Sequence, residues 1–430
     1  MSTVGVVGAG YVGLTTAACF AHLGHDVACA DVDTAKLTRL SRGEIPFMEE
    51  GLAGLVEAGL RSERLRFVDG AAEAAAGPEF VFLCVPTPAG PEDAADLSCV
   101  HEAVAEVAPV MEAGSVLVAK STMPPGSSRQ LARALKEAGA VGRGVAVATN
   151  PEFLREGTAV FDFLHPDRVV VGCDDPAVAM RVARLYDDLG APVLVTGCAS
   201  AEMIKYAANA FLATRVSFIN AVANLCEVLD ADVREVSLGM GYDPRIGFDF
   251  LRPGPGFGGS CLPKDTAALI RVAEAAGYDF SLLRGTMEVN RAQPERMVAK
   301  IAAAASVTGG LSGAQVAVWG LAFKAHTDDL RHSPALAVAE RLVKEGATVR
   351  AYDPAVSSGA VQPFTVLSDP YSAVEGADVL AVLTEWDTFR WVDFERVRAL
   401  MRNPAVVDTR NLLDPASLRR LGFSYQGVGR

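Results

Sequence analysis

Thr3-Val-Gly-Val-Val-Gly-Ala-Gly-Tyr-Val-Gly13 is a short apolar run that breaks into glycines, and an apolar helical pattern follows it to about His22. In a strand–turn–helix unit, the Gly8-x-Gly10-x-x-Gly13 spacing permits a tight turn, lets a pyrophosphate approach the backbone and lets helix and strand pack closely. The N-terminus of such a helix stabilises phosphate through its unpaired N–H groups and its dipole. The segment therefore predicts a dinucleotide-binding βα unit at the start of the chain.

An acidic residue at the end of the next predicted strand indicates which dinucleotide is bound. Residues 26–31 are typical of a strand and end in Asp31, close to the spacing of about 20 residues at which such folds place an acid. A carboxylate there accepts hydrogen bonds from the adenosine ribose and repels a 2′-phosphate, which favours NAD over NADP. The alternative interpretation is a glycine turn that holds no ligand.

Strand-like and helical patterns alternate along the first 198 residues. The apolar runs lie at 80–85, 115–120, 145–149, 168–172 and 193–196. Such alternation is typical of an α/β domain in which helices cover both faces of a parallel sheet. A helical pattern without Pro or Gly then runs from Ala199 to about Leu229. A helix of roughly thirty residues is longer than most globular helices, so we expect it to bridge domains or to form a subunit interface.

The opening pattern returns weakly in the last third of the chain. Residues 315–320 resemble the first strand, and residues 348–353 resemble the second strand with its terminal acid. The segment Gly320-Leu-Ala-Phe-Lys324 lacks the three glycines, so we expect no second NAD site there. We therefore predict two doubly wound domains joined by a long central helix, with the second joint at Ser306–Gly313.

Composition excludes several classes of function. The formal net charge is −13, so most of the surface repels phosphate backbones and we expect no general nucleic-acid binding. We find neither an apolar run that approaches ~18 residues nor a basic N-terminal region, and so predict no membrane association and a cytoplasmic location. The eight cysteines form no CxxC pair and the histidines show no ligand spacing, which predicts neither a disulfide framework nor a metal site.

Cys261 is the one cysteine with a reactive setting. Pro263 favours a helix start, which puts Cys261 near a helix N-terminus where a thiolate is stabilised, and Lys264 adds positive charge. This arrangement favours a nucleophile, and the alternative is a structural thiol. Asp265 is four residues further on and either shares a face with Cys261 or only complements the helix dipole.

Two polar pairs, each four residues apart, are further candidates. Lys205 and Asn209 lie on an otherwise apolar face of the long helix, where they can hold an oxyanion or form a solvated stripe. Glu152 and Glu156 follow a strand end, where they can position and deprotonate water or simply begin a solvated helix. Thr122 also follows a strand and either lines the cofactor site or belongs to a turn.

The chain resembles the UDP-glucose/GDP-mannose dehydrogenase family over nearly its whole length. An ordered set of motifs carries this resemblance, and the motif around Cys261 is the most specific of them. One departure is His332, at a position where members commonly carry an acid. The set consists of Gly8-Ala-Gly-Tyr-Val-Gly13, Val85-Pro-Thr-Pro88, Lys120-Ser-Thr122, Asn150-Pro-Glu-Phe-Leu-Arg-Glu156, Lys205-x-x-x-Asn209, Gly256-Phe-Gly-Gly-Ser-Cys-Leu-Pro-Lys-Asp265, Gly320-Leu-Ala-Phe-Lys324 and Thr384-Glu-Trp386.

This resemblance implies a fold and a reaction. It implies an NAD-binding Rossmann-like domain over 1–198, a central helical and dimerisation region with the cysteine loop over 199–305, and a UDP-sugar-binding Rossmann-like domain over 306–430. Members oxidise the primary alcohol of a sugar nucleotide twice, to the carboxylate, and reduce two NAD. A thiohemiacetal and then a thioester form on the cysteine, which explains why one site performs two oxidations without releasing the aldehyde.

The resemblance also implies roles for individual residues and a homodimer in which Arg245 reaches the partner's substrate. The implied catalytic residues are Cys261, Lys205, Asn209, Asp265, Glu156, Thr122 and Glu152. The implied cofactor contacts are Gly8, Gly10, Tyr11, Val12, Gly13, Asp31, Lys36, Thr87, Thr122, Glu156, Lys264 and Arg331. The implied substrate contacts are Glu152, Phe153, Leu154, Lys205, Asn209, Arg245, Phe250, Leu251, Gly258, Lys324 and Arg410. No metal is implied.

Several alternatives remain at this point. The segments Thr384-Glu-Trp386 and 250–256 are most similar to members that oxidise UDP-glucose to UDP-glucuronate, and GDP-mannose or a UDP-N-acetyl sugar is the alternative substrate. A two-electron dehydrogenase of the 3-hydroxyacid or 6-phosphogluconate type needs neither Cys261 nor a second nucleotide-like domain. A non-catalytic sugar-nucleotide sensor is expected to have lost Cys261, Lys205 or Asp265, and all three are present.

Overall fold

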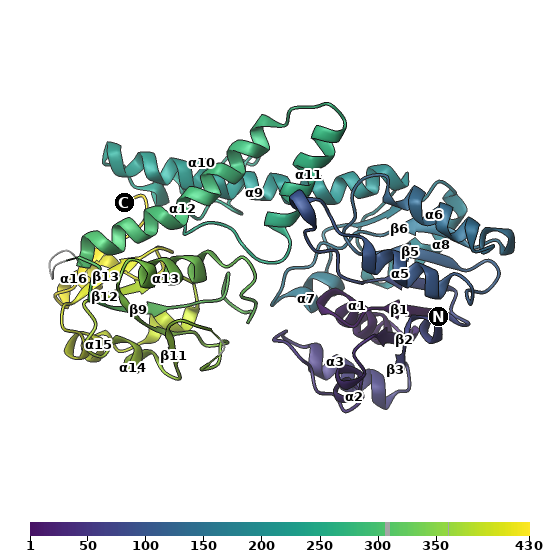
Figure 1. Ribbon diagram of the computed structural model, residues 1–430, viewed down its shortest axis with the longest axis horizontal. Coiled ribbons are helices and arrows are strands. Elements are labelled where there is room, and N and C mark those ends of the chain that lie inside the picture. The colour runs from purple at the N-terminus through teal and green to yellow at the C-terminus, as the bar shows by residue number, and fades with distance from the viewer. Residues whose placement is uncertain (306–309, 360) are drawn as a thin grey trace. The chain divides into compact units, whose positions relative to one another are not determined.

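The computed structural model describes residues 1–305, 310–359 and 361–430 (Figure 1). The chain forms two compact units. The first consists of Met1–Ala208 and Ala267–Tyr278, and the second of Asn209–Thr266 and Asp279–Arg430. Part of the predicted joint at Ser306–Gly313 lies outside the described residues.

An eight-stranded sheet in the order β3-β2-β1-β4-β5-β6-β7-β8 forms the centre of the first unit. All neighbouring strands are parallel except β6 and β7. The strands are β1 (Thr3–Val7), β2 (Asp26–Asp31), β3 (Leu65–Asp69), β4 (Phe80–Leu83), β5 (Val116–Ala119), β6 (Ala146–Thr149), β7 (Val169–Gly172) and β8 (Val193–Thr196).

The antiparallel step between β6 and β7 corrects the expectation of a wholly parallel sheet. The segment between them contains the loop with Glu152 and Glu156 and one helix, α7 (Ala159–Leu164). Six helical residues span only ~9 Å, so the helix does not return the chain to the opposite edge of the sheet. The chain therefore re-enters the sheet from the edge that it left.

Helices cover both faces of this sheet, as predicted. Alternate strand residues contact opposite layers, because successive side chains of a strand point to opposite faces. Val6 packs with Leu14 and Phe20 of α1, whereas Val7 packs with Val104 of α5 and Leu131 of α6. The helices are α1 (Tyr11–His22), α2 (Thr34–Leu40), α3 (Leu52–Arg61), α4 (Ala71–Ala75), α5 (Ser98–Val107), α6 (Ser127–Glu137), α7 and α8 (Pro176–Ala183), with 3-10 turns η1 (Pro91–Asp93), η2 (Val141–Arg143) and η3 (Arg184–Leu189).

The second unit contains a six-stranded parallel sheet in the order β11-β10-β9-β12-β13-β14. The first six strands of the larger sheet have the same order, so the weak sequence repeat corresponds to a repeated doubly wound fold. The elements are β9 (Gln315–Trp319), α13 (Pro334–Lys344), β10 (Thr348–Tyr352), β11 (Thr365–Leu367), α14 (Pro370–Val374), β12 (Val379–Val382), η5 (Asp387–Trp391), α15 (Phe394–Leu400), β13 (Ala405–Asp408), α16 (Pro415–Arg420) and β14 (Ser424–Gln426).

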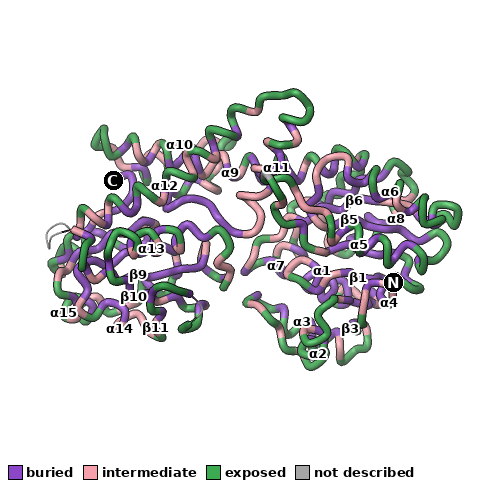
Figure 2. Tube along the Cα trace, in the orientation of Figure 1, coloured by how far each residue is buried: buried purple, intermediate pink, exposed green. Residues whose placement is uncertain are grey.

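Local sequence explains where several helices begin. α8, α13, α14 and α16 each start with Pro directly after an Asp or Ser whose side chain accepts a hydrogen bond from a first-turn N–H. Proline suits this position because its missing N–H would have no helical partner there. Figure 2 shows that most strands are buried and that the helices alternate between buried and exposed residues, whereas the edge strand β8 is largely exposed.

Four further helices complete the described part of the chain, namely α9 (Cys198–Leu229), α10 (Val233–Gly241), α11 (Leu262–Ala275) and α12 (Ser281–Ala305). α9 begins one residue before the predicted position, and its first residues belong to the first unit and the rest to the second. Among the described residues, α9 alone is long and apolar enough, by length and composition, to cross a membrane, although polar residues such as Lys205 and Arg215 interrupt its apolar run. Core helices of soluble proteins can be equally long and apolar, and Lys205, Asn209 and Asn220 of α9 each bond to protein groups.

Candidate active site

The glycine turn of the first unit has the shape that a dinucleotide requires. Gly8 has φ +100°, and a Cβ at Gly13 would lie 1.7 Å from the carbonyl oxygen of Gly8. A Cβ at Gly10 would meet no atom within 4 Å, so the backbone there is open to a ligand. The close packing at Gly13 and the open face at Gly10 match the requirements of a pyrophosphate beside a helix N-terminus, and NAD therefore fits this turn. Tyr11 and Val12 form the first turn of α1.

Asp31 stands at the end of β2 beside this turn. Its Oδ2 accepts a hydrogen bond from the N–H of Ala9 at 2.9 Å and from the Nζ of Lys36 at 2.8 Å. Burial alone would raise the pKa of Asp31, but Lys36 and the N–H groups of Asp33 and Ala9 hold it below its usual value. The carboxylate is thus ionised where a ribose would be bound, and Lys36, a cofactor contact implied by the resemblance, lies beside it.

Two threonines join neighbouring loops at the carboxyl ends of β4 and β5. The Oγ1 of buried Thr87 donates to the carbonyl oxygen of Thr122 at 2.9 Å, and Thr122 is also buried. Close by in sequence, the buried Lys120 donates to the Oδ1 of Asn150 at 3.1 Å. Burial lowers the pKa of Lys120 to about 8, although Cys84 and Glu152 partly oppose this shift.

The structure pairs Lys205 with Glu152. The two side chains lie 2.8 Å apart and are each only 5% exposed. Burial would raise the pKa of Glu152, but Lys205 lowers it most and the N–H of Leu154 adds a hydrogen bond at 2.7 Å, so the pKa is lowered overall. The Lys205 ammonium also lies 5.4 Å from the Phe153 ring centroid. Glu152, Phe153, Leu154 and Lys205 therefore form one group in the first unit.

Cys261 lies directly before α11, as the proline had indicated, and is partly exposed. Six of the other cysteines are buried, and Cys99 is partly exposed. The N–H of Asp265 donates to the carbonyl oxygen of Cys261 at 2.9 Å, which is the first helical hydrogen bond of α11. Cys261 therefore has the position at a helix N-terminus in which a thiolate is stabilised.

A second charged group surrounds Asp265, which has no exposed surface. Asn209 donates from its Nδ2 to the Oδ2 of Asp265 at 2.7 Å, and the Nζ of Lys264 lies 2.5 Å from the Oδ1. Asn209 and Lys205 are therefore bound to two different carboxylates rather than to each other. Lys264, implied as a cofactor contact, contacts Asp265 within the second unit.

The glycine-rich loop before Cys261 is held by side-chain amides from α9 and α12. The Oδ1 of Asn220 accepts from the N–H of Gly254 at 2.8 Å, and Gln293 donates to its carbonyl oxygen at 3.0 Å. Asn290 exchanges two hydrogen bonds with the backbone of Phe257. The sequence interpretation missed these three residues, although polar side chains on otherwise apolar helices were a signal that could have found them.

The same loop packs closely against the C-terminal domain. A Cβ at Gly258 would lie 2.2 Å from the carbonyl oxygen of His332. The N–H of Gly259 donates to the carbonyl oxygen of Arg331 at 3.0 Å. Arg410 lies against Gly254 and donates to the carbonyl oxygens of Leu383 and Phe323, next to Lys324. Gly258, Lys324 and Arg410 are thus brought together around the glycine loop.

The remaining predicted residues differ in exposure and have local partners. The Arg331 side chain is 63% exposed and pairs with Asp329, and the Arg245 side chain is 86% exposed and pairs with Asp243. Leu251 is buried, and its carbonyl oxygen accepts from the Ser237 hydroxyl at 2.9 Å. Phe250 precedes it with φ +59°.

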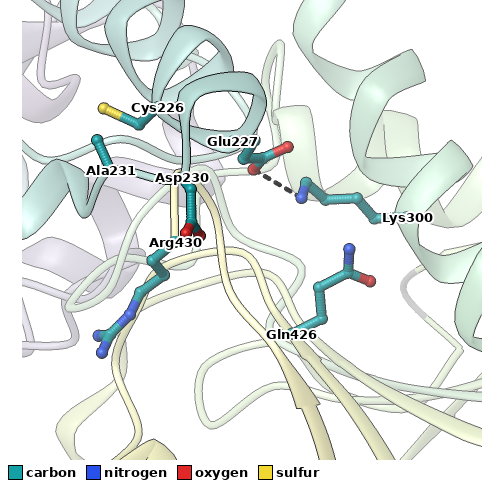
Figure 3. Close-up of a pocket in the computed structure, with 7 residues that line it drawn as sticks. All are labelled: Cys226, Glu227, Asp230, Ala231, Lys300, Gln426 and Arg430. Carbon is teal, nitrogen blue, oxygen red and sulfur yellow. Dashed lines mark ion pairs between the residues drawn. The ribbon is translucent and has the colours of Figure 1, made fainter.

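A separate pocket of about 380 Å³ lies in the second unit at the end of α9 (Figure 3). None of the predicted site residues lines it. Its one ion pair between lining residues joins Glu227 and Lys300 at 2.6 Å, and Glu227 also accepts from the N–H of Gly429 at 2.7 Å. These contacts hold the C-terminal residues against α9 and α12. Over the described part of the chain, no group of three or more His, Cys, Asp or Glu could hold a metal ion.

Comparison with known families gives matches along most of the chain. Residues 2–190 match the NAD binding domain of the UDP-glucose/GDP-mannose dehydrogenase family, residues 199–292 its central domain and residues 317–415 its UDP binding domain. The chain is 44% identical to a UDP-glucose 6-dehydrogenase of Pseudomonas aeruginosa, with 99% of this chain and 97% of that protein covered. It is 39% identical to the UDP-glucose 6-dehydrogenase TuaD of Bacillus subtilis, with 100% and 94% covered.

Solved structures have the same fold. A UDP-glucose dehydrogenase from Pyrobaculum islandicum superposes with a TM-score of 0.91 at 37% identity, with 100% of this chain and 98% of that chain covered. A UDP-D-ManNAc dehydrogenase from Pyrococcus horikoshii superposes with a TM-score of 0.90 at 30% identity, with 100% and 99% covered.

Proposed function

Since the chain belongs to the UDP-glucose/GDP-mannose dehydrogenase family, we propose that it oxidises UDP-glucose to UDP-glucuronate and reduces two NAD. The observation that carries the proposal is Cys261 directly before α11, four residues before a buried Asp265 that Asn209 and Lys264 contact. UDP-glucose is favoured over GDP-mannose and UDP-N-acetyl sugars because relatives with 39–44% identity over nearly their full length are named UDP-glucose 6-dehydrogenases.

The first unit provides the glycine turn and the ribose contact for the cofactor. Gly8, Gly10 and Gly13 provide the turn for the pyrophosphate, and the ionised Asp31 accepts hydrogen bonds from the ribose. Further contacts are proposed from Tyr11, Val12, Lys36, Thr87, Thr122, Glu156, Lys264 and Arg331. When bound, NAD supplies a hydride acceptor for each of the two oxidations.

Lys205, Asp265 and Asn209 act in the first oxidation. Lys205 and Asp265 bind the substrate hydroxyl, or a water that takes its proton, while the carbon loses a hydride and becomes an aldehyde. Lys205 is suited to this role because its ammonium is buried beside Glu152, so its charge is little screened. Lys205 and Asn209 then stabilise the negative oxygen that develops at the carbonyl.

Cys261 retains the aldehyde. Its sulfur bonds to the aldehyde carbon and the oxygen takes a proton, which forms a thiohemiacetal. Loss of a second hydride and of the hydroxyl proton leaves a thioester. Glu156, with Thr122 and Glu152 in support, positions a water whose oxygen bonds to the thioester carbon as the carbon–sulfur bond breaks. The products are a carboxylate and the free thiol, so atoms and electrons balance over two hydride transfers.

The family pattern also places several proposed substrate contacts in the second unit. Lys324 and Arg410 beside the glycine loop are suited to the diphosphate, because guanidinium and ammonium groups bind phosphate oxygens well. Phe250, Leu251 and Gly258 complete the second unit's own contribution, and Phe153 and Leu154 are proposed from the first. Arg245 reaches the substrate of the partner subunit in this proposal.

An exposed apolar stripe on α9 supports a homodimer. Phe211, Phe218 and Leu225 are 62%, 52% and 56% exposed and are spaced by seven residues, so they lie along one side of the helix. A second copy of the same helix is the partner that we propose for this stripe. A cytoplasmic location belongs to the same proposal.

The yield of NADH from limiting UDP-glucose tests the reaction, with GDP-mannose and UDP-N-acetyl sugars as parallel substrates. We expect two NADH per UDP-glucose and little from the other sugar nucleotides. One NADH would indicate that the aldehyde is released, which would contradict the role of Cys261. Two NADH from another sugar nucleotide and none from UDP-glucose would keep the mechanism and overturn the substrate.

A further inference from the structure

We propose that Glu49 is a positioning residue for Glu156 and links it to the dinucleotide turn through Tyr11. This inference rests on the proposed role of Glu156 in hydrolysing the thioester. All the residues that carry it belong to the first unit.

Glu49 is a buried carboxylate that accepts backbone N–H groups from the segment just after Glu156. Its Oε2 accepts from the N–H of Gly157 at 2.7 Å, and its Oε1 accepts from the N–H of Val160 at 3.2 Å. Glu49 lies just before α3, and it precedes Gly157 by more than 100 positions in the chain. A long-range bond of this kind fixes the place of the loop and not only its local shape.

The two residues that flank Glu156 are both held by carboxylates. On one side, the N–H of Arg155 donates to the Oδ2 of Asp162 at 2.9 Å. On the other side, Glu49 holds the N–H of Gly157, whose φ of +85° favours glycine. The backbone at Glu156 is therefore fixed from before and after, and the partly exposed Glu156 side chain extends from a restrained position. Asp162 is local to the loop, whereas Glu49 connects the loop to another part of the unit.

Tyr11 connects this contact to the cofactor turn. Its hydroxyl donates to the Oε2 of Glu49, and the N–H of Gly157 donates to the same hydroxyl at 2.6 Å. Tyr11 directly follows Gly10, where the backbone is open to the pyrophosphate. Burial, the bond to Glu49 and the charge of Glu156 together raise the pKa of Tyr11 well above its usual value, so the hydroxyl stays a donor.

The chemical consequence concerns one step of the proposed reaction. Water must approach the thioester from a defined direction, and a displacement of ~1 Å in a catalytic group can cost up to about 100-fold in rate. Loss of the Glu49 carboxylate is therefore expected to slow hydrolysis while the two hydride transfers continue. The thioester on Cys261 would then accumulate.

The test compares Glu49→Gln with Glu156→Gln, and Glu50→Gln is the matched control because Glu50 is the exposed neighbour of Glu49. The full-length enzyme is mixed with NAD and UDP-glucose and quenched in acid during turnover. The fraction of Cys261 that carries a UDP-glucuronyl adduct is measured by intact mass. Hydrogen exchange of the peptide over 153–162 is measured on the same proteins.

We expect Glu49→Gln to raise the acylated fraction several-fold, to lower kcat by about 10-fold and to speed exchange of the Gly157 and Val160 amides. Glu50→Gln should match the parent in all three. Faster exchange in Glu49→Gln without more adduct would overturn the inference and leave a structural role only. If Glu49→Gln is too unstable to purify, Glu49→Asp keeps the charge on a shorter side chain and is judged by the same three readouts.

The variant Glu156→Gln separates failure of the inference from failure of the proposed function. If Glu156→Gln accumulates the adduct and Glu49→Gln does not, only the positioning role of Glu49 is refuted. If Glu156→Gln accumulates none, the hydrolytic role of Glu156 is refuted and the inference with it.

Discussion

Breaking the buried ion pair of Glu152 and Lys205 is predicted to lower the free energy of unfolding of the first unit. The two charges lie 2.8 Å apart, so at an effective dielectric constant of 20 their attraction is about 6 kcal/mol. Desolvation offsets much of this attraction, and breaking a buried pair by removing one partner typically costs about 3–5 kcal/mol. Removing both charges costs far less, since no charge is then left buried alone.

The two single substitutions are not expected to be equal. Glu152→Met leaves the Lys205 ammonium buried and also removes a carboxylate that favours the charged form of buried Lys120. Lys205→Met leaves Glu152 with the N–H of Leu154 and the charge of Lys120. We therefore expect Glu152→Met to destabilise the first unit by about 4–5 kcal/mol and Lys205→Met by about 3 kcal/mol. The cost of the double variant should be about 3 kcal/mol smaller than the sum of the two single costs.

Denaturant unfolding can follow the first unit separately, because all three tryptophans, Trp319, Trp386 and Trp391, belong to the second unit. Tryptophan fluorescence reports the second unit, and far-UV circular dichroism reports both. The transition seen only by circular dichroism should move in the single variants and recover in the double variant. Equal costs for the two single variants, or additive costs in the double variant, would refute this reasoning.

The remaining predictions concern catalysis, cofactor choice, pH and assembly. Cys261→Ala should abolish carboxylate formation, and UDP-glucuronate produced at the parent rate would contradict the covalent mechanism. Asp31→Asn should shift the ratio of kcat/KM for NADP to that for NAD by about 10-fold or more, because a charge that repels the 2′-phosphate is removed; an unchanged ratio would contradict that role. Lys120 has a pKa of about 8 in the folded state, below its usual 10.5, so the folded protein loses this proton at a lower pH than the unfolded chain does. The free energy of unfolding should therefore rise by about 3 kcal/mol between pH 8 and pH 10.5. Unfolding curves of Lys120→Met should lack this rise with pH. Phe218→Glu should convert the proposed homodimer to monomer in analytical ultracentrifugation, whereas Trp391→Glu, which changes an 84% exposed residue elsewhere, should not.

Much of the fold followed from local pattern. The long helix was predicted to within one residue of its start, since an uninterrupted helical period over ~30 residues has few alternatives. The three-residue strands β11 and β14 were missed because they contain too few residues to show a period. Strand β3 was missed because the charged residues Arg66 and Asp69 interrupt its apolar run. Strand β7 was predicted at 168–172, but its antiparallel direction was not, since strand direction depends on the path of the connection and not on the strand residues.

The sequence alone determined the glycine turn, the acid at Asp31 and the place of Cys261 before a helix. Each of these depends on residues within one strand, turn or helix start, where the number of residues between two positions determines how they lie relative to each other. Only the tertiary structure decided that Lys205 pairs with Glu152, that Asn209 pairs with Asp265 and that Glu49 holds Gly157. Those partners are more than 50 residues apart, and they meet because the packing of separate elements buries them together. A buried charge must find a partner, but the sequence does not show which partner the packing brings to it.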